Sequence, residues 1–134
     1  MQNIPEGKTA LGLDNNLGAL ICYLNICFPF GLIYSIIVLV TDKTNKLPRF
    51  HAVQSILLAL AGIPLAILYV LGTAIGFALD VFLGIPFVTL LLWLLITLIA
   101  LAVVAGGIFA AVKAFQGQMF KLPVIGNLAD KFSN

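Results

Sequence analysis

The sequence predicts an all-α integral membrane protein with three long, kinked transmembrane helices and a C-terminal segment at the membrane interface. Of its 134 residues, 62% are hydrophobic and only 9% are charged, whereas a typical soluble domain has about 25% charged residues. The charges are also unevenly spaced, because none occurs between Asp14 and Asp42, between His51 and Asp80, or between Asp80 and Lys113. Each window exceeds the roughly 20 residues that a helix needs to cross a bilayer. These features exclude a soluble globule, a disordered chain, a nucleic-acid binder and a disulfide scaffold.

Residues 1–14 are predicted to be a polar leader, with Asp14 as the N-cap of a first helix over 17–41. This helix has a weak point, where three residues that interrupt helices stand close together: Asn25, Pro29 and Gly31. Proline removes a backbone donor and crowds the preceding turn. We therefore expect a kink. The alternative is a complete break, which gives a bundle of four segments, makes the first half re-entrant and moves the N-terminus across the membrane.

The second and third helices are predicted over 49–79 and 86–116. Pro48 and Pro86 suit the beginnings of these two helices, and Pro64 predicts a kink in the second. The uncharged part of the second helix extends about 42 Å, more than the roughly 30 Å hydrocarbon core, so a tilt or an interfacial end must accommodate the excess. The whole chain, 1–134, is expected to form a single membrane domain.

Small residues recur at a spacing of four on both of these helices. They are Gly72 and Gly76 on the second helix, and Ala102, Gly106, Ala110 and Ala114 on the third. Such rows let helix backbones approach closely in lipid. We expect contacts within the chain, and a homodimer seam is the alternative. The tail, 117–134, mixes apolar and charged residues in the manner of a segment at the cytoplasmic interface.

Six of the seven basic residues lie in the first loop or the tail region, and only Lys8 precedes the first apolar window. With three spans, the positive-inside rule places the loop and the C-terminus in the cytoplasm and the N-terminus outside. The first apolar window is too long for the core of a signal peptide. We expect a multi-pass protein of the bacterial cytoplasmic (inner) membrane.

The candidate binding residues lie at the start of the second helix. His51 and Gln54 share one helical face, and Arg49 stands beside them. Together with Lys121 they form a possible site for an anionic lipid headgroup or for a partner's carboxylate. The alternative is that they only anchor the helix at the level of the headgroups.

No catalytic or metal-binding residue is predicted. His51 and Asp80 are 29 residues apart on one helix, about 43 Å, so they cannot form a dyad. Cys22 and Cys27 have no histidine or carboxylate nearby to complete a metal site, and are interpreted as buried apolar side chains. We expect no enzymatic activity, no cofactor and no nucleic-acid partner.

Several strings in the sequence together resemble a known family. They are Lys8-Thr9-Ala10-Leu11-Gly12-Leu13-Asp14 with Ala19-Leu20-Ile21-Cys22-Tyr23-Leu24, Arg49-Phe50-His51-Ala52-Val53-Gln54-Ser55, and Lys113-Ala114-Phe115-Gln116-Gly117 with Phe120-Lys121-Leu122-Pro123-Val124-Ile125-Gly126. In this order they are similar to small bacterial membrane proteins of uncharacterised function related to the twenty-kilodalton component of the chloroplast inner-envelope protein-import translocon. Those plastid proteins are drawn with four spans rather than three. The resemblance implies a role for Arg49, His51 and Gln54 beyond anchoring, and no catalytic residue.

The predicted function is therefore that of a small, non-enzymatic membrane subunit in a translocation or channel-like assembly. Three tightly packed helices cannot enclose an aqueous pore, so this hypothesis requires a homo-oligomer or an unidentified membrane protein partner. The alternative is a lipid-binding or membrane-stress protein that holds an anionic lipid at the site described above.

Overall fold

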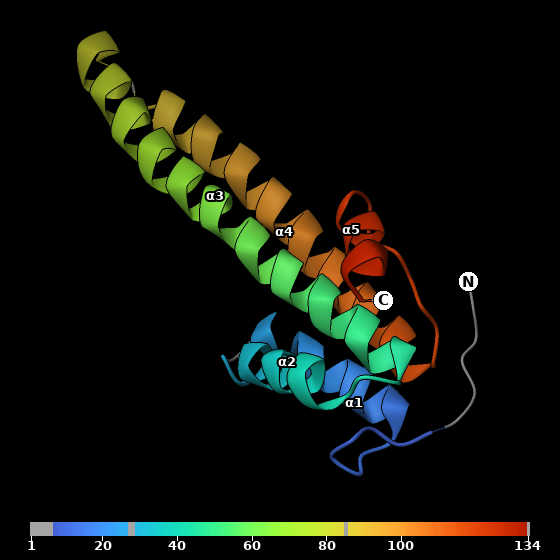
Figure 1. Cartoon of the computed structure of the whole chain (residues 1–134). Coiled ribbons are helices and arrows are strands. Elements are labelled where there is room, and N and C mark those ends of the chain that lie inside the picture. The colour runs from blue at the N-terminus through green and yellow to red at the C-terminus, as the bar shows by residue number, and fades with distance from the viewer. Residues whose placement is uncertain (1–6, 27–28, 85, 134) are drawn as a thin grey trace. The chain divides into compact units, whose positions relative to one another are not determined.

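The structure is a computed structural model that describes residues 7–26, 29–84 and 86–133. Figure 1 shows its helices: α1 (Asn15–Ile21), the 3₁₀ helix η1 (Cys22–Ile26), α2 (Phe30–Thr41), α3 (Lys46–Leu83), α4 (Val88–Phe115) and α5 (Ile125–Phe132). The described residues contain no strand, although Lys8 and Asp14 form an isolated bridge. The all-helical prediction is confirmed. By length and composition, two of these helices, α3 and α4, are suited to cross a membrane.

The prediction of a third span is not confirmed. The expected helix over 17–41 is divided into α1 and η1 on one side and α2 on the other. Pro29 stands directly before α2, which fits the break that a proline imposes. With 12 residues, α2 is only about 18 Å long, well short of the hydrocarbon core. Cys27, expected to be buried, lies outside the described residues.

Two further elements agree with the predictions in place but differ in detail. Asp14 occupies the N-cap position of α1, but its side chain makes no capping hydrogen bond. The second helix is longer than predicted and begins at Lys46, because Pro48 falls within its first turn, where a missing backbone donor costs nothing. Pro64 is accommodated inside α3.

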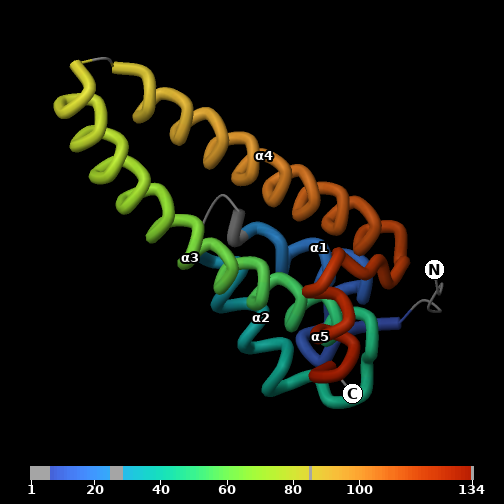
Figure 2. Tube along the Cα trace, turned by 90° about the horizontal axis from the view of Figure 1, so that it is seen from above, coloured from blue at the N-terminus to red at the C-terminus, as the bar shows by residue number. Residues whose placement is uncertain are grey.

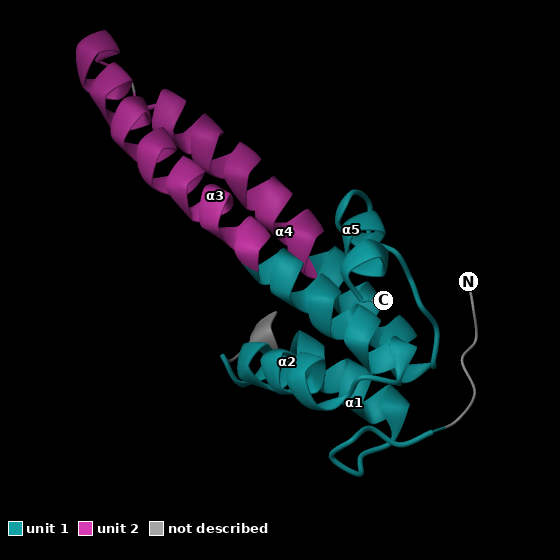
Figure 3. Ribbon diagram, viewed as in Figure 1, with its two compact units in different colours: residues 1–59, 105–134 teal, residues 60–104 magenta. Residues whose placement is uncertain are grey.

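The chain divides into two compact units, coloured separately in Figure 3. Unit 1 comprises residues 1–59 and 105–134, and unit 2 comprises residues 60–104. In unit 2 the two helices run side by side in opposite directions (Figures 1 and 2). A Cβ atom built on Gly76 would lie only 2.9 Å from Cα of Thr89. The backbones of α3 and α4 are therefore so close at this point that only glycine fits.

Polar and aromatic groups reinforce the helix pair of unit 2. The Trp93 indole donates a hydrogen bond to the Thr73 hydroxyl (3.0 Å), and the Tyr69 and Trp93 rings lie 5.5 Å apart. Asp80 accepts hydrogen bonds from the backbone N–H groups of Val88 (2.8 Å) and Thr89 (3.1 Å). Because the first N–H groups of a helix have no partner within it, Asp80 serves as a remote cap of α4.

Unit 1 has an interior that is unusually polar. Cys22, Val38 and Ala52 form a small apolar cluster, while His51, Gln54, Ser35 and Ser55 are completely buried around it. In α5, the small residues that face inward are Gly126 and Ala129. The apolar side chains of Leu128 and Phe132 on the same helix are exposed.

Candidate functional site

The centre of unit 1 is a polar group that we call the tail-binding cluster: Tyr23, His51 and Gln54 together with the backbone of Gln118, Phe120 and Leu122. The Tyr23 hydroxyl lies 2.9 Å from Nδ1 of His51 and accepts a hydrogen bond from Nε2 of Gln54, also at 2.9 Å. The α3 face that carries His51 and Gln54 is thereby joined to η1.

The same side chains hold the segment that precedes α5. Nε2 of His51 lies 3.1 Å from the carbonyl oxygen of Gln118. Nε2 of Gln54 donates to the carbonyl of Phe120 (3.1 Å), and its Oε1 accepts from the N–H of Leu122 (3.4 Å). The side-chain amide of Gln54 therefore makes one donor and one acceptor contact with the backbone of the tail. Both of its polar atoms have hydrogen-bond partners.

These contacts define the protonation state of His51. A carbonyl oxygen can only accept, so Nε2 must carry a proton to bond Gln118. The Tyr23 hydroxyl, which accepts from Gln54, can then donate to an unprotonated Nδ1. Every hydrogen bond in the cluster is satisfied by the neutral imidazole protonated at Nε2, and a second proton would leave the Tyr23 O–H without its acceptor.

Arg49 is also engaged within unit 1. Its Nη1 donates to the carbonyl oxygens of Leu39 (3.3 Å) and Asp42 (3.0 Å), at the end of α2. Its Nε donates to the carbonyl of Ser133, just after α5. The guanidinium thus complements the unpaired carbonyls at two helix C-termini.

Lys121, the fourth predicted binding residue, lies apart from the cluster. Its ammonium bonds Asp130 at 2.8 Å, and Lys46 lies 3.9 Å from the other oxygen of the same carboxylate. The hydrogen bond from Lys121 lowers the pKa of the Asp130 carboxyl, and the positive charges of Lys121 and Lys46 act in the same direction.

The structure therefore brings His51 and Gln54 together and gives each of the four predicted residues a partner inside the protein. Whether any of them also binds a lipid or a partner stays a prediction. Tyr23 was not identified from the sequence as part of the cluster, because it lies 28 positions before His51 and no local pattern connects them. The buried pair Ser35–Ser55 (2.8 Å) was missed for the same reason.

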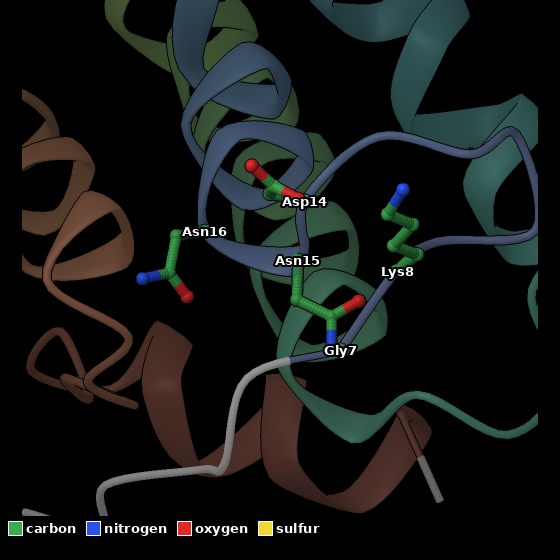
Figure 4. A pocket seen from close by; sticks show the side chains of 5 residues that line it. All are labelled: Gly7, Lys8, Asp14, Asn15 and Asn16. Atoms are coloured by element: carbon green, nitrogen blue, oxygen red, sulfur yellow. The ribbon is translucent and has the colours of Figure 1, made fainter.

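A separate pocket of about 440 Å³ lies at the start of α1 (Figure 4). It is lined by Gly7, Lys8, Asp14, Asn15 and Asn16. Figure 4 shows the Asn15 amide beside Gly7, and Asn16 pointing away on the other side of the helix start. Oδ1 of Asn15 is buried without a hydrogen-bond partner, but the other polar groups do not converge on it. Among the described residues, no group of three metal-ligating side chains occurs here or elsewhere.

The predicted packing residues differ in their surroundings. In unit 2, Gly72 and Gly76 face Ile96 and Thr89. In unit 1, Ala110 and Ala114 are fully buried, and a Cβ atom on Gly106 would lie 3.4 Å from Leu122. Ala102 is exposed.

A second small-residue pair was overlooked in the sequence, although its spacing is visible there. Gly62 and Ala66 are four residues apart on α3, and both are exposed. Apart from its chain neighbours and the backbone of its own helical turns, no atom in the described part of the chain lies within 4 Å of a Cβ built on Gly62. A shallow apolar groove of about 410 Å³ on the same helix is lined by Ile63, Ala66, Ile67, Val70 and Leu71.

Comparison with known proteins identifies the relatives. Residues 14–129 match the MamF/MmsF family, described as the magnetosome magnetite crystal formation protein family. A UPF0132 membrane protein of Methanocaldococcus jannaschii is 39% identical over 127 residues, 95% of this chain and 96% of the relative. A second from that organism is 31% identical, covering 92% and 73%, and one from Archaeoglobus fulgidus is 29% identical, covering 89% and 95%. No solved structure matches the chain significantly.

The proposed relationship to the chloroplast import translocon is wrong, because these comparisons link the chain to a different family. The strings that suggested it are short, and in the structure the Arg49–Ser55 and Phe120–Gly126 segments contain the contacts that hold the tail. The relatives named above are archaeal, so they do not support the expected bacterial membrane. The family match, the relatives and the two long apolar helices agree in indicating a membrane protein. The chain belongs to the MamF/MmsF family and is similar to archaeal UPF0132 membrane proteins.

Proposed function

We propose that this chain is a non-enzymatic membrane protein that works as a subunit of a homo-oligomeric membrane assembly. The observation that carries the proposal is the Gly62–Ala66 pair beside the apolar groove on α3. Lipid offers no hydrophobic drive for helix association, so a close approach of backbones at small residues is the usual basis of it. The Gly72–Gly76 pair is occupied by α4, whereas the Gly62–Ala66 pair is open to a helix from a second copy.

The matching family is described as a magnetosome magnetite crystal formation family, but three of the five carboxylates of this chain already have partners within the protein. Binding an iron mineral calls for oxygen ligands that are free and close together. Asp42 is buried and accepts from Ala10 and Asn45. Asp80 caps α4, and Asp130 is paired with Lys121.

An anionic-lipid site at Arg49, His51, Gln54 and Lys121 is also less well supported than assembly. His51 and Gln54 are completely buried, and their polar atoms are used by Tyr23 and by the tail. A headgroup would have to displace the tail before it could reach them.

Native mass spectrometry of the protein extracted in lipid nanodiscs tests the proposal. We expect a defined homo-oligomer, which Ala66→Leu converts to monomer because the larger side chain fills the groove. Ala78→Leu is the matched control, since Ala78 is exposed on the same helix outside the groove. A wild-type monomer would contradict the proposal, and a one-to-one complex with another protein would replace it with an accessory role.

A further inference from the structure

The segment from α1 to α2 consists of two limbs, α1 with η1 and then α2, and each limb is too short to cross a bilayer. α1 and η1 together extend about 20 Å, and α2 extends about 18 Å. The hydrocarbon core is roughly 30 Å thick. Figures 1 and 2 show the two limbs side by side, and Cys22 of the first shares a buried cluster with Val38 of the second.

The two ends of this segment are fastened to each other. Oδ2 of Asp42, just after α2, accepts from the N–H of Ala10, just before α1 (3.2 Å). The Asn45 amide donates to the carbonyl of Lys8 (2.8 Å) and to both oxygens of Asp42. A chain that enters and leaves at one place cannot have its ends on opposite sides of a membrane.

The outer face of α2 is apolar, and its inner face is small or polar. Phe30, Ile33, Ile36, Ile37 and Val40 are exposed, by 39–68%, and their spacing places them along one side of the helix. Gly31, Ser35 and Val38 are buried on the other side. This arrangement is the reverse of a water-soluble helix, so the outer face requires an apolar medium.

The charge distribution agrees with a segment that returns. All seven lysines and arginines lie within the residue ranges of unit 1, and Asp80 is the only charged residue within those of unit 2. If the segment crossed the bilayer, Lys8 would lie opposite Lys43 and Lys46. If it returns, all seven basic residues lie on one side, as the positive-inside rule favours.

We infer that α1, η1 and α2 form a hairpin that enters the membrane from the basic side and returns to it, with the outer face of α2 in contact with the acyl chains of that leaflet. The N-terminal segment, the 42–45 loop and the tail then share one side of the membrane. This inference favours the re-entrant alternative over the expectation of an N-terminus opposite the tail. The inference is independent of the oligomeric state proposed above.

Single-cysteine labelling tests where the hairpin ends. In a Cys22→Ala, Cys27→Ala background, Lys8→Cys, Thr44→Cys and Phe87→Cys replace exposed residues. A membrane-impermeant maleimide is applied to spheroplasts of a bacterial host before and after permeabilisation. We expect Lys8→Cys and Thr44→Cys to react from one side and Phe87→Cys from the other. If Lys8→Cys reacts from the side of Phe87→Cys, the segment crosses the bilayer and the inference fails.

Spin labels at Ile33→Cys and Thr44→Cys test the lipid contact, in vesicles of phosphatidylcholine and phosphatidylglycerol. We expect the label at position 33 to be relaxed by dissolved oxygen more than by a water-soluble nickel chelate, and the label at 44 to show the reverse. Access of the chelate to position 33 would place α2 in water. Protection from both reagents would mean that protein covers α2, and either result overturns the lipid contact.

Discussion

The hydroxyl of Tyr23 lies 2.9 Å from Nδ1 of His51, although 28 positions separate the two residues in the sequence. The same hydroxyl receives a hydrogen bond from Gln54, so one oxygen atom joins η1 to two successive positions on a face of α3. Hydrogen bonds in such a buried chain polarise one another. The tail is therefore held by side chains that η1 has already oriented.

Removal of this oxygen should destabilise the protein measurably. Tyr23→Phe leaves Nδ1 of His51 and one amide donor of Gln54 in a dry interior, and an unsatisfied buried group costs about 1–3 kcal/mol. We expect thermal unfolding in detergent to shift to lower temperature. Tyr69→Phe is the matched control, because Tyr69 is exposed. This variant should unfold at the same temperature as the wild type. Equal unfolding temperatures for both variants would contradict the role given to Tyr23.

Loss of Gln54 should release the tail. Gln54→Leu keeps a side chain of similar size but removes the bonds to the carbonyl of Phe120 and the N–H of Leu122, together with the bond to the Tyr23 hydroxyl. We expect faster hydrogen exchange in residues 118–122 and earlier proteolysis of the tail. The control is Gln116→Leu at an exposed position. Unchanged protection of residues 118–122 would show that other contacts hold the tail.

The glycines of α3 should respond in opposite ways to the same substitution. Gly76→Ala brings a methyl group within 2.9 Å of the Thr89 backbone, so the two helices of unit 2 must separate. Gly62→Ala meets no neighbouring side chain within its own chain and removes a glycine from a helix interior, a gain of about 0.5–1 kcal/mol for the single chain. Resistance to unfolding in sodium dodecyl sulfate should fall with the first variant and not with the second. A similar loss for both would contradict this assignment, because the higher helix propensity of alanine cannot itself lower stability.

Asp80 should stabilise the first turn of α4 more than the rest of that helix. Asp80→Ala removes the acceptor for the N–H groups of Val88 and Thr89, and their hydrogen exchange should quicken. Asp14→Ala is an informative comparison, because Asp14 occupies the N-cap of α1 without a side-chain bond. We expect no corresponding change at the start of α1. Slow exchange at Val88 in the Asp80 variant would exclude the remote cap.

The ion pair of Lys121 and Asp130 should make the attachment of α5 depend on acidity. The folded pKa of Asp130 is below its ordinary value, so the pair stabilises the folded state fully above the unfolded pKa. This stabilisation is lost as the pH falls through the folded pKa. Hydrogen exchange in α5, corrected for its intrinsic pH dependence, should therefore increase in acid, and Asp130→Asn should remove the response. A response that persists in that variant would assign it to another group.

The two long helices were predictable because their evidence is local. Hydropathy and length alone indicate α3 and α4, and Pro29 marked the weak point before α2. What the sequence left undecided was whether the chain turns back at that point. The contacts that decide it, Asp42 to Ala10 and Asn45 to Lys8, join residues 32 and 37 positions apart.

The candidate site was predictable only in part, for the same physical reason. His51 and Gln54 are three residues apart and so lie on one helical face, which indicated a shared role. Their partners, however, lie on η1 and on the tail. A polar residue near a membrane boundary has the same local pattern whether it faces a headgroup or the protein interior. Burial distinguishes the two cases, and burial here depends on segments far away in the chain.

The attachment of the tail also has a consequence for biosynthesis. His51, Gln54 and Arg49 obtain their tail partners from residues 66 to 84 positions later in the chain. At about 5–20 residues per second, a ribosome needs several seconds to supply them. During that interval these side chains must be hydrated or held by the insertion machinery. Unit 1 can therefore close only after both long helices have been synthesised, so a chain truncated before Gln118 should be recognised as unfinished by membrane proteases.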